Sequence, residues 1–395
     1  MSIPTRQREA AEGPAPRGTD RAAGLHVLHV CQPVEGGVGR YVHDACLDQL
    51  ARGWRVNLAC PTGTLSRDLV AAGVRWRSWP ATRSPGPATL AETLALRRII
   101  DSVGADVVHL HSSKAGLAGR LAVRARLPTL FQPHGWSWLA ATGRTGRLAL
   151  RWERLAARWT TTVVCVGDGE RAVGDDAGVT APTRVVRNGV DRRRFPAPEP
   201  GARAEARATL GLRDDQPLVV CPGRLTRQKG QDVLLAAWPA VRERCPTAVL
   251  ALVGDGDLAA GLLRDAPAGI RFVPPTPDVR AWLLAADVVA LPSRWEGLPL
   301  TALEAAATGR STVGSDINGL REVVVTGTGR LVTPDDPDAL ARALIERLSC
   351  PGTAAAEGAR ALELVERFDQ RHTLDTLARL TADLVGTVSS RDGRR

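Results

Sequence analysis

The chain has 395 residues, of which 44% are hydrophobic and 24% charged, and its formal net charge at pH 7 is +10. This length exceeds one ordinary hydrophobic core and predicts two domains of a globular protein that folds in water. No stretch approaches the roughly 20 apolar residues of a membrane-spanning helix, and the excess arginines are spread along the chain without a helix-turn-helix or RNA-recognition signature, which argues against a nucleic-acid partner.

The ends of the chain and its cysteines indicate the compartment. Residues 1–23 mix Pro, Gly and both charge signs without an apolar segment, so we expect a disordered leader rather than a signal peptide. Residues 387–395 are expected to be a disordered tail. Seven cysteines include no C-x-x-C pair, which argues against a zinc site or a disulfide framework and fits a reducing cytoplasm.

The first half of the chain alternates short apolar strands with helical segments, the order that predicts a parallel sheet flanked by helices. Strands are expected at 26–31, 56–59, 74–79, 107–110, 129–132, 163–166 and 184–186.

A Pro-rich stretch after the turn at 188–191 marks the expected domain boundary, with a first domain over 24–196 and a second over 197–386. The alternation then restarts, with strands expected at 218–221, 249–253, 270–273, 288–291 and 312–313. The helical pattern over 354–384 is expected to cross back onto the first domain. Two α/β domains of one class in tandem predict a ligand in the cleft between facing strand ends.

In the first domain, a glycine loop and a histidine follow predicted strands. Gly36 and Gly37 lie between the first strand and its helix, where the backbone can approach a phosphate or a sugar closely, although the spacing is not that of a dinucleotide fingerprint. His134 follows another strand and could hydrogen-bond a substrate hydroxyl or carbonyl. His109 and His111 face one side of their strand, and with no third ligand nearby we interpret them as structural.

In the second domain, the turn GRLTRQKG at 223–230 follows a strand. Arg224 and Lys229 could clamp a diphosphate there, although a solvated helix start is the plainer alternative. Lys114 and Lys229 are the only lysines of the chain, and for Lys114 a structural role is equally favoured. The D-x-D at 255–257 could hold a divalent metal, but its glycines favour a simple turn, and we expect no metal site.

The stretch PSRWEGLPLTALEAAATG at 292–309 joins a buried strand to a helix. Glu296 lies in the loop and Glu304 a little over a turn inside the helix, so both could face one ligand from different heights. The backbone amides from Gly297 to Leu300 would lack partners at the helix start and could bind an anion or hydroxyl groups. This arrangement suits a polyhydroxylated substrate.

Arginines and apolar residues alternate along a predicted helix at 147–159. Such a basic amphipathic helix could lie on an anionic membrane, which would place the protein at its inner face. The alternative, which we favour, is that the apolar side of the helix packs on its own sheet.

These motifs together resemble glycosyltransferase family 4, the retaining group 1 enzymes with the GT-B architecture of two Rossmann-like domains. The resemblance runs from about Leu25 to the final helix, and its most specific part is the E-x7-E element, Glu296 to Glu304. Similar motifs are GGVGRYV in the first domain, HLHSSKAG at 109–116, NGVDRRRF at 188–195, GRLTRQKG at 223–230 and GRLVTPDDPDALARAL at 329–344.

The resemblance implies a role for each site residue. Catalytic roles fall to His134 near the sugar, to Arg224 and Lys229 at the donor diphosphate, and to Glu296 at the transferred sugar. Glu304 would bind the ribose. Further binding positions are Gly36, Gly37, Gly223, Gly297, Leu298 and Leu300.

The implied activity is transfer of a hexosyl group from a UDP- or GDP-sugar to a glycan, lipid-linked or small-molecule hydroxyl, with retention and with neither metal nor cofactor. A nucleotide-sugar epimerase or phosphorylase of the same architecture is the alternative. A nucleotide-sugar binding protein without catalysis is a third interpretation.

Overall fold

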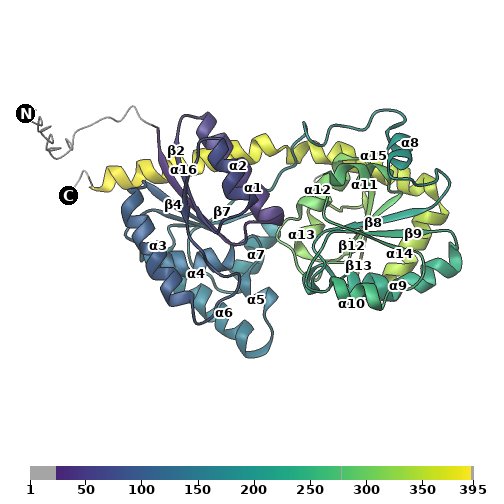
Figure 1. Ribbon diagram of the computed structural model, residues 1–395, viewed down its shortest axis with the longest axis horizontal. Coiled ribbons are helices and arrows are strands. Elements are labelled where there is room, and N and C mark those ends of the chain that lie inside the picture. The colour runs from purple at the N-terminus through teal and green to yellow at the C-terminus, as the bar shows by residue number, and fades with distance from the viewer. Residues whose placement is uncertain (1–23, 277, 393–395) are drawn as a thin grey trace, which may run out of the picture.

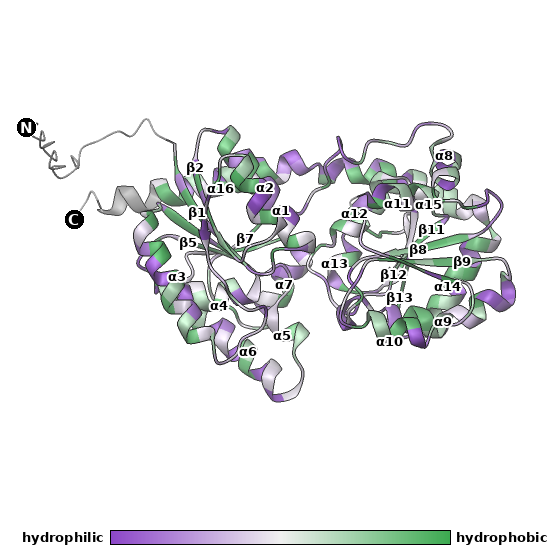
Figure 2. Cartoon of the chain, viewed as in Figure 1, coloured by the Kyte–Doolittle hydropathy of each residue, from purple (hydrophilic) through white to green (hydrophobic). Residues whose placement is uncertain are grey.

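The computed structural model describes residues 24–276 and 278–392, with side chains of the last helix as far as Gly386. Two parallel α/β sheets, each covered by helices, form two lobes along the long axis of the molecule (Figure 1). The strands are predominantly hydrophobic, whereas the covering helices alternate hydrophobic and hydrophilic residues (Figure 2). The leader predicted over 1–23 lies outside the described residues.

The first sheet has seven parallel strands in the order β3-β2-β1-β4-β5-β6-β7. Its strands are β1 (His26–Cys31), β2 (Arg55–Cys60), β3 (Arg75–Ser78), β4 (Val107–His111), β5 (Thr129–Gln132), β6 (Thr162–Cys165) and β7 (Thr183–Val185). The helices of this lobe are α1 (Gly36–Ala51), α2 (Thr64–Ala71), α3 (Thr89–Val103), α4 (Ser112–Val123), α5 (Ser137–Ala140), α6 (Gly143–Ala156) and α7 (Asp168–Asp176). The strand order reverses between β1 and β4, which creates a crevice at their carboxyl ends.

The second sheet has six parallel strands in the order β10-β9-β8-β11-β12-β13. Its strands are β8 (Leu218–Pro222), β9 (Val249–Val253), β10 (Ile270–Val273), β11 (Val288–Leu291), β12 (Ser311–Ser315) and β13 (Gly329–Val332). Its helices are α8 (Ala202–Thr209), α9 (Gln231–Arg244), α10 (Ala259–Arg264), α11 (Val279–Ala285), α12 (Leu300–Ala307), α13 (Asn318–Arg321), α14 (Pro337–Ser349) and α15 (Pro351–Leu364). Here the order reverses between β8 and β11, so both sheets have a ligand crevice of the same kind. The predicted boundary at 196–197 lies between β7 and β8.

The last helix, α16 (Gln370–Asp392), crosses back onto the first lobe, as predicted (Figure 1). Leu377 is buried there in one hydrophobic cluster with Val27 and Tyr41. The tail predicted to begin after Gly386 is wrong as far as Asp392, because α16 continues to that residue. The apolar side chains of its preceding turns, which pack on the first lobe, give the helix a surface along which to extend.

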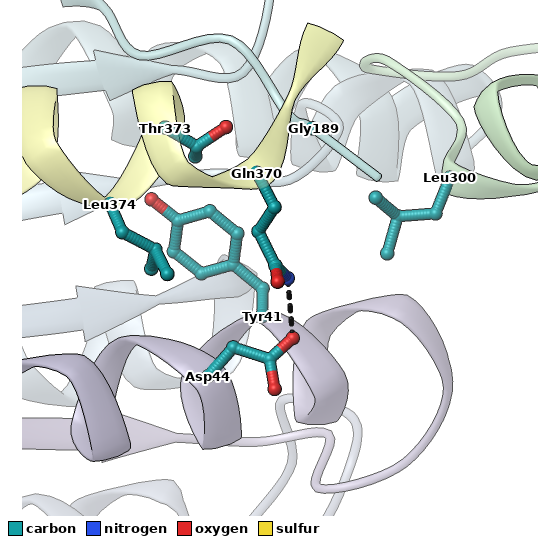
Figure 3. Close-up of a pocket in the computed structure, with 7 residues that line it drawn as sticks. All are labelled: Tyr41, Asp44, Gly189, Leu300, Gln370, Thr373 and Leu374. Carbon is teal, nitrogen blue, oxygen red and sulfur yellow. Dashed lines mark hydrogen bonds between the residues drawn. The ribbon is translucent and has the colours of Figure 1, made fainter. Parts of the chain in front are cut away.

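A hydrogen bond joins the two lobes, and a second holds the start of α16 on the first lobe beside a small cavity. The Asn188 side-chain amide donates to the Leu298 carbonyl (2.7 Å), and Gln370 Nε2 of α16 donates to Asp44 Oδ2 of α1 (2.6 Å). The cavity beside this second bond measures about 10 Å³ and is lined by Tyr41, Asp44, Gly189, Leu300, Gln370, Thr373 and Leu374 (Figure 3). Because this volume is about that of one water probe, the cavity belongs to the junction and is too small for a substrate.

Helix α6 docks by a face that carries a buried ion pair, which the sequence did not predict. Its Glu153 is buried and forms an ion pair with the buried Arg120 of α4 (2.7 Å). Leu148 and Leu155 lie on the outer side and are 61% and 42% exposed. The favoured expectation that the stripe of Leu148, Trp152, Leu155 and Trp159 packs inward is therefore wrong for the two leucines, because the ion pair fixes the opposite face inward. Trp152 and Trp159 are partly buried, and the Trp152 ring centroid lies 5.6 Å from the Arg120 guanidinium carbon.

Candidate functional site

The loop between β11 and α12 holds Glu296 in a fixed position. Its Oε1 accepts hydrogen bonds from Lys229 Nζ (2.6 Å) and Ser293 Oγ (2.8 Å), and its Oε2 accepts one from Gln228 Nε2 (3.3 Å). The carboxylate is 9% exposed and the lysine 16%. Lys229 and Glu296, which the sequence assigns to one site, are therefore brought into direct contact.

The turn after β8 presents a second cation. Arg224 follows Gly223 at the carboxyl end of the strand, and its Nη2 lies 3.4 Å from the Gln228 side-chain oxygen. Burial is the largest cause that lowers the pKa of Arg224, followed by the nearby Arg83, while Glu296 acts in the opposite direction. Two cations and one carboxylate thus converge where β8 and β11 end, at the reversal point of the second sheet.

The glycine loop of the first lobe faces this turn. A Cβ placed on Gly36 would lie 4.0 Å from Arg224 Cδ, and one on Gly37 would lie 3.7 Å from Leu300 Cδ1. Gly36 also has a positive φ of 66°, a conformation that L side chains rarely adopt. The loop therefore borders the predicted diphosphate position from the opposite lobe. Because these glycines have no side chains, the backbone of the loop can lie close to the second lobe.

The amides predicted at the start of α12 are available. Gly297 and Leu298 make no backbone N–H hydrogen bond within the described part of the chain, and Leu300 is the first helical residue. A Cβ on Gly297 would come within 2.7 Å of Val166 Cγ2 in the first lobe, so this loop also lies at the junction.

Glu304 differs from Glu296 in its partner. It is 3% exposed and forms an ion pair with Arg40 of α1, in the first lobe. Burial raises the pKa of Glu304, while Arg40 opposes this shift. Arg40 lies inside the GGVGRYV motif, but the sequence did not assign it to the site, because its partner lies 264 residues away.

His134 joins a cluster of buried rings. Its Nε2 lies 3.2 Å from His111 Nδ1, and its ring packs edge-on against Tyr41 at a centroid distance of 5.0 Å. The prediction that no third ligand lies near His109 and His111 is wrong: the nitrogens of these two rings and of His29 lie within 4.8 Å of one another. The reason is strand pairing, since His29 of β1 is in register with His109 of β4.

Glu170 of α7 is a buried carboxylate that the sequence did not single out. Its oxygens accept hydrogen bonds from the backbone N–H groups of Gly135 (2.5 Å) and Val166 (2.7 Å). Burial raises the pKa of Glu170 to about 7. The side chain therefore ties the turn that carries His134 to the carboxyl end of β6.

Two other candidates have structural surroundings. Lys114 is 1% exposed and is paired with Glu92, so its ammonium does not face the cleft. The turn at 254–257 packs on the turn after β8, where a Cβ on Gly254 would meet the Gly223 carbonyl oxygen at 2.1 Å. This contact explains the glycines around Asp255 and Asp257 without a metal.

Two family models match the chain. The model described as Glycosyltransferase Family 4 matches residues 35–194, and the model described as Glycosyl transferases group 1 matches residues 216–350. The matches cover the glycine loop in the first lobe and the Arg224 turn with both glutamates in the second.

Individual relatives support the same assignment over longer spans. The chain is 33% identical over 361 residues to a GDP-mannose-dependent alpha-(1-6)-phosphatidylinositol monomannoside mannosyltransferase of Mycolicibacterium smegmatis, covering 85% of this chain and 91% of that protein. It is 31% identical over 267 residues to the UDP-Gal:alpha-D-GlcNAc-diphosphoundecaprenol alpha-1,3-galactosyltransferase of Escherichia coli, covering 64% and 68%. Among solved structures, a sucrose-phosphate synthase from Thermosynechococcus elongatus superposes with a TM-score of 0.78 at 23% identity, over 92% of this chain and 100% of that one. This last similarity supports the GT-B fold.

Proposed function

The chain belongs to the family 4, group 1 glycosyltransferases, which use nucleotide sugars, and we propose that it transfers a hexosyl group from a UDP- or GDP-sugar to a hydroxyl with retention and without a metal ion. The observation that carries this proposal is the convergence of Arg224, Lys229 and Glu296 opposite the glycine loop. A diphosphate between the lobes would meet both cations, and its sugar would lie near the carboxylate.

The two cations would stabilise the leaving nucleoside diphosphate. As the bond to the anomeric carbon breaks, negative charge grows on the phosphate oxygens, and fixed positive groups lower the energy of that transition state. Because Arg224 and Lys229 supply this charge, we propose that no divalent ion is required. Activity should persist after treatment with a chelator, and a strict manganese requirement would contradict the proposal.

Glu296 would bind the transferred sugar rather than attack it. Three side-chain donors hold its oxygens, and the contact with Lys229 reduces its strength as a nucleophile. We therefore propose front-face attack, in which the leaving phosphate accepts the proton of the acceptor hydroxyl and the anomeric configuration is retained. The anomer of the product, read by NMR, tests this step, and inversion would overturn it.

Glu304 would bind the ribose hydroxyls of the donor. In the structure its carboxylate is paired with Arg40, so the nucleotide would have to exchange this ion pair for hydrogen bonds from the ribose. His134 would contact the sugar from the first lobe.

The relatives narrow the substrates to test. Their names specify UDP-galactose and GDP-mannose as donors and lipid-linked acceptors, a diphosphoundecaprenol and a phosphatidylinositol mannoside. We propose a donor of this type and a glycan, lipid-linked or small-molecule acceptor. Incubation with a panel of UDP- and GDP-sugars and both acceptor types should release the nucleoside diphosphate only when an acceptor is present.

The same panel tests the alternatives. An epimerised sugar still attached to its nucleotide, or strict dependence on inorganic phosphate, would indicate an epimerase or phosphorylase. Donor binding without turnover of any acceptor would indicate a binding protein.

Contact with a membrane is a second proposal, favoured by the exposed face of α6. Leu148 and Leu155 project outward beside the exposed Arg147 and Arg151. No helix in the described part of the chain is long and apolar enough to span a bilayer. Sedimentation with anionic vesicles should decrease on raising salt and on replacing both leucines by serine. Equal sedimentation with neutral vesicles, or none with anionic ones, would contradict the proposal.

A further inference from the structure

A continuous chain of hydrogen-bonded side chains runs from the cleft into the first sheet. His134 Nε2 lies 3.2 Å from His111 Nδ1, and His111 Nε2 lies 2.9 Å from His29 Nδ1. His29 Nε2 then lies 2.9 Å from the side-chain oxygen of Gln49. His29 and His111 are 0% exposed and Gln49 is 1% exposed, so water cannot substitute for either of the two inner links.

The three rings are electrically neutral at pH 7. Burial lowers the pKa of His29 to about 4 and that of His134 to about 3, and it holds the pKa of His111 well below the ordinary histidine value. A neutral imidazole carries one N–H, so in each ring one nitrogen donates and the other accepts.

The Gln49 amide is oriented with its oxygen toward His29 Nε2, and this oxygen, which can only accept, sets the direction of the whole chain; the Gln49 Nε2 is buried and makes no hydrogen bond within the described residues. His29 must therefore carry its proton on Nε2, which leaves Nδ1 as an acceptor. The proton of the next link must then come from His111 Nε2, and its Nδ1 becomes an acceptor in turn. The last link requires the proton on His134 Nε2.

We propose that His111 and His29 are positioning residues that fix His134 as its Nε2–H tautomer, so that His134 Nδ1 presents a lone pair to the donor sugar. This inference rests on the proposed contact between His134 and the sugar. His134 is partly exposed, and its Nδ1 makes no hydrogen bond within the described residues and is not among their buried polar atoms that lack a partner, so this nitrogen is accessible from the cleft. The turn carrying it adjoins Gly297, since a Cβ there would lie 3.4 Å from the Gly135 nitrogen.

The fixed tautomer determines which sugars the ring accepts. A hydroxyl group can donate a hydrogen bond to His134 Nδ1, whereas the ionised carboxylate of a uronic acid is only an acceptor and would face a second lone pair. The site therefore selects a donor sugar that bears a hydroxyl at this position. Because the His134 ring stays neutral, binding such a sugar adds no positive charge to the site.

A metal ion held by His29, His109 and His111 is the competing interpretation of these rings. His29 Nδ1 and His111 Nε2 are hydrogen-bonded to each other, so neither could bind an ion without breaking this link of the chain. No carboxylate is among the neighbouring groups that shift the pKa of these three rings. A divalent ion would therefore be buried without compensating charge, which costs far more than a neutral hydrogen-bonded chain.

Nitrogen NMR of the full-length protein, labelled with 15N at histidine, measures the tautomers directly and without substrate. We expect His29, His111 and His134 all in the Nε2–H form, assigned by single substitutions. The Nδ1–H form at all three, which a reversed Gln49 amide would impose, would overturn the inference, as would one equivalent of tightly bound metal in the purified protein. Because this readout needs no activity, it is independent of the proposed function.

A pair of variants at His111 then separates positioning from packing. In His111→Asn the amide oxygen can replace ring Nδ1 as an acceptor, whereas His111→Leu fills similar space and cannot accept. We expect His111→Leu to release the His134 tautomer and to weaken donor binding about three- to tenfold, the effect of one hydrogen bond. His111→Asn should keep both the tautomer and the affinity.

Three further outcomes would decide the matter. Equal losses of affinity in the two His111 variants would contradict a positioning role, as would an unchanged tautomer in a folded His111→Leu protein. His26→Gln is the control, because His26 is a buried histidine at the other end of β1 and is hydrogen-bonded to Asn57 of β2. A loss of donor binding in His26→Gln as large as in His111→Leu would also contradict the positioning role. Failure of every nucleotide sugar to bind the wild type would instead refute the proposed function, while the tautomers would still be measured.

Discussion

The only two lysines of the chain each form an ion pair with a glutamate, one in each lobe, and the two pairs differ in access. Lys114 and Glu92 of the first lobe are 1% and 8% exposed, and the ammonium also donates to Thr82, Ser84 and Thr89. Lys229 and Glu296 of the second lobe are 16% and 9% exposed, and they adjoin the loop amides at Gly297 and Leu298, which have no partner among residues 24–276 and 278–392.

The difference separates a structural pair from the pair of the same chemistry that we propose binds the donor. Around Lys114 every donor is used within the fold, which ties the segment at 82–92 to α4. Around Lys229 the partners come from one turn and one loop at the reversal point of the sheet, where a ligand can approach. Residue type and charge are therefore not sufficient to assign a function, and access to the cleft decides it.

Lys114→Met is expected to have the largest effect, a loss of stability. Removal of one partner leaves the Glu92 carboxylate buried without its cation, which costs about 3–5 kcal/mol of unfolding free energy. Burial raises the pKa of Glu92, but the hydrogen bonds from Lys114 and Thr82 lower it further, below its ordinary value. Urea denaturation measures the loss, and the double variant with Glu92→Gln should recover most of it. A specific loss of turnover by folded Lys114→Met protein would break the comparison.

Lys229→Met should act on catalysis instead. Loss of one fixed positive group at the leaving phosphate is expected to lower kcat/KM about 100- to 1,000-fold, or about 3–4 kcal/mol in the transition state. The unfolding free energy should fall less than in Lys114→Met, because Ser293 and Gln228 still donate to Glu296. Steady-state kinetics and urea denaturation of the two lysine variants, measured side by side, test this contrast; the opposite ranking would refute it.

Glu170 extends the comparison to a buried carboxylate without a lysine. Burial raises its pKa from 4.5 to about 7, so the folded state keeps a proton that the unfolded state has lost. Stability should therefore fall as pH rises from about 4.5 to about 7, by roughly 3 kcal/mol at 1.36 kcal/mol per unit. Glu170→Gln should lack this component, and identical pH profiles for wild type and variant would show that Glu170 does not titrate in this way.

Arg40→Ala is expected to have the smallest effect. Arg40 is 34% exposed and Glu304 is buried, but burial already raises the pKa of Glu304, so its carboxyl can bind a proton when the cation is removed and the loss of stability is small. If the ribose must displace Arg40, its removal should tighten binding of a nucleoside diphosphate about two- to fivefold. Titration calorimetry measures the change, and weaker binding would indicate that Arg40 itself contacts the nucleotide.

The sequence predicted most of the fold because the sheets are built from buried parallel strands. Continuous apolar runs such as 218–221 and 288–291 identify central strands, and the glycine turns after them mark the site. The turn with Arg224 and Lys229 and the loop with Glu296 could be assigned to one cleft, because both follow central strands of the second sheet.

The remaining features depend on which elements become neighbours in space. His29 joins His109 only through the pairing of β1 with β4. The partner of Lys114 is Glu92 on another helix, and the partner of Arg40 is in the other lobe. For α6, helical periodicity gave two faces, but only the ion pair between Glu153 and Arg120 shows which one docks.

The central claim is that Lys229, unlike Lys114, binds the donor diphosphate without a metal ion. Calorimetric titration of UDP and GDP in the presence of a chelator tests this claim most directly. Wild type, Lys229→Met and Lys114→Met are compared under conditions where all three are folded. We predict that one of the nucleotides binds wild type and Lys114→Met with the same affinity and binds Lys229→Met about ten- to a hundredfold more weakly, the loss of a hydrogen bond to a charged group. Equal affinity of Lys229→Met and wild type, or no binding of either nucleotide to the wild type, would contradict the account.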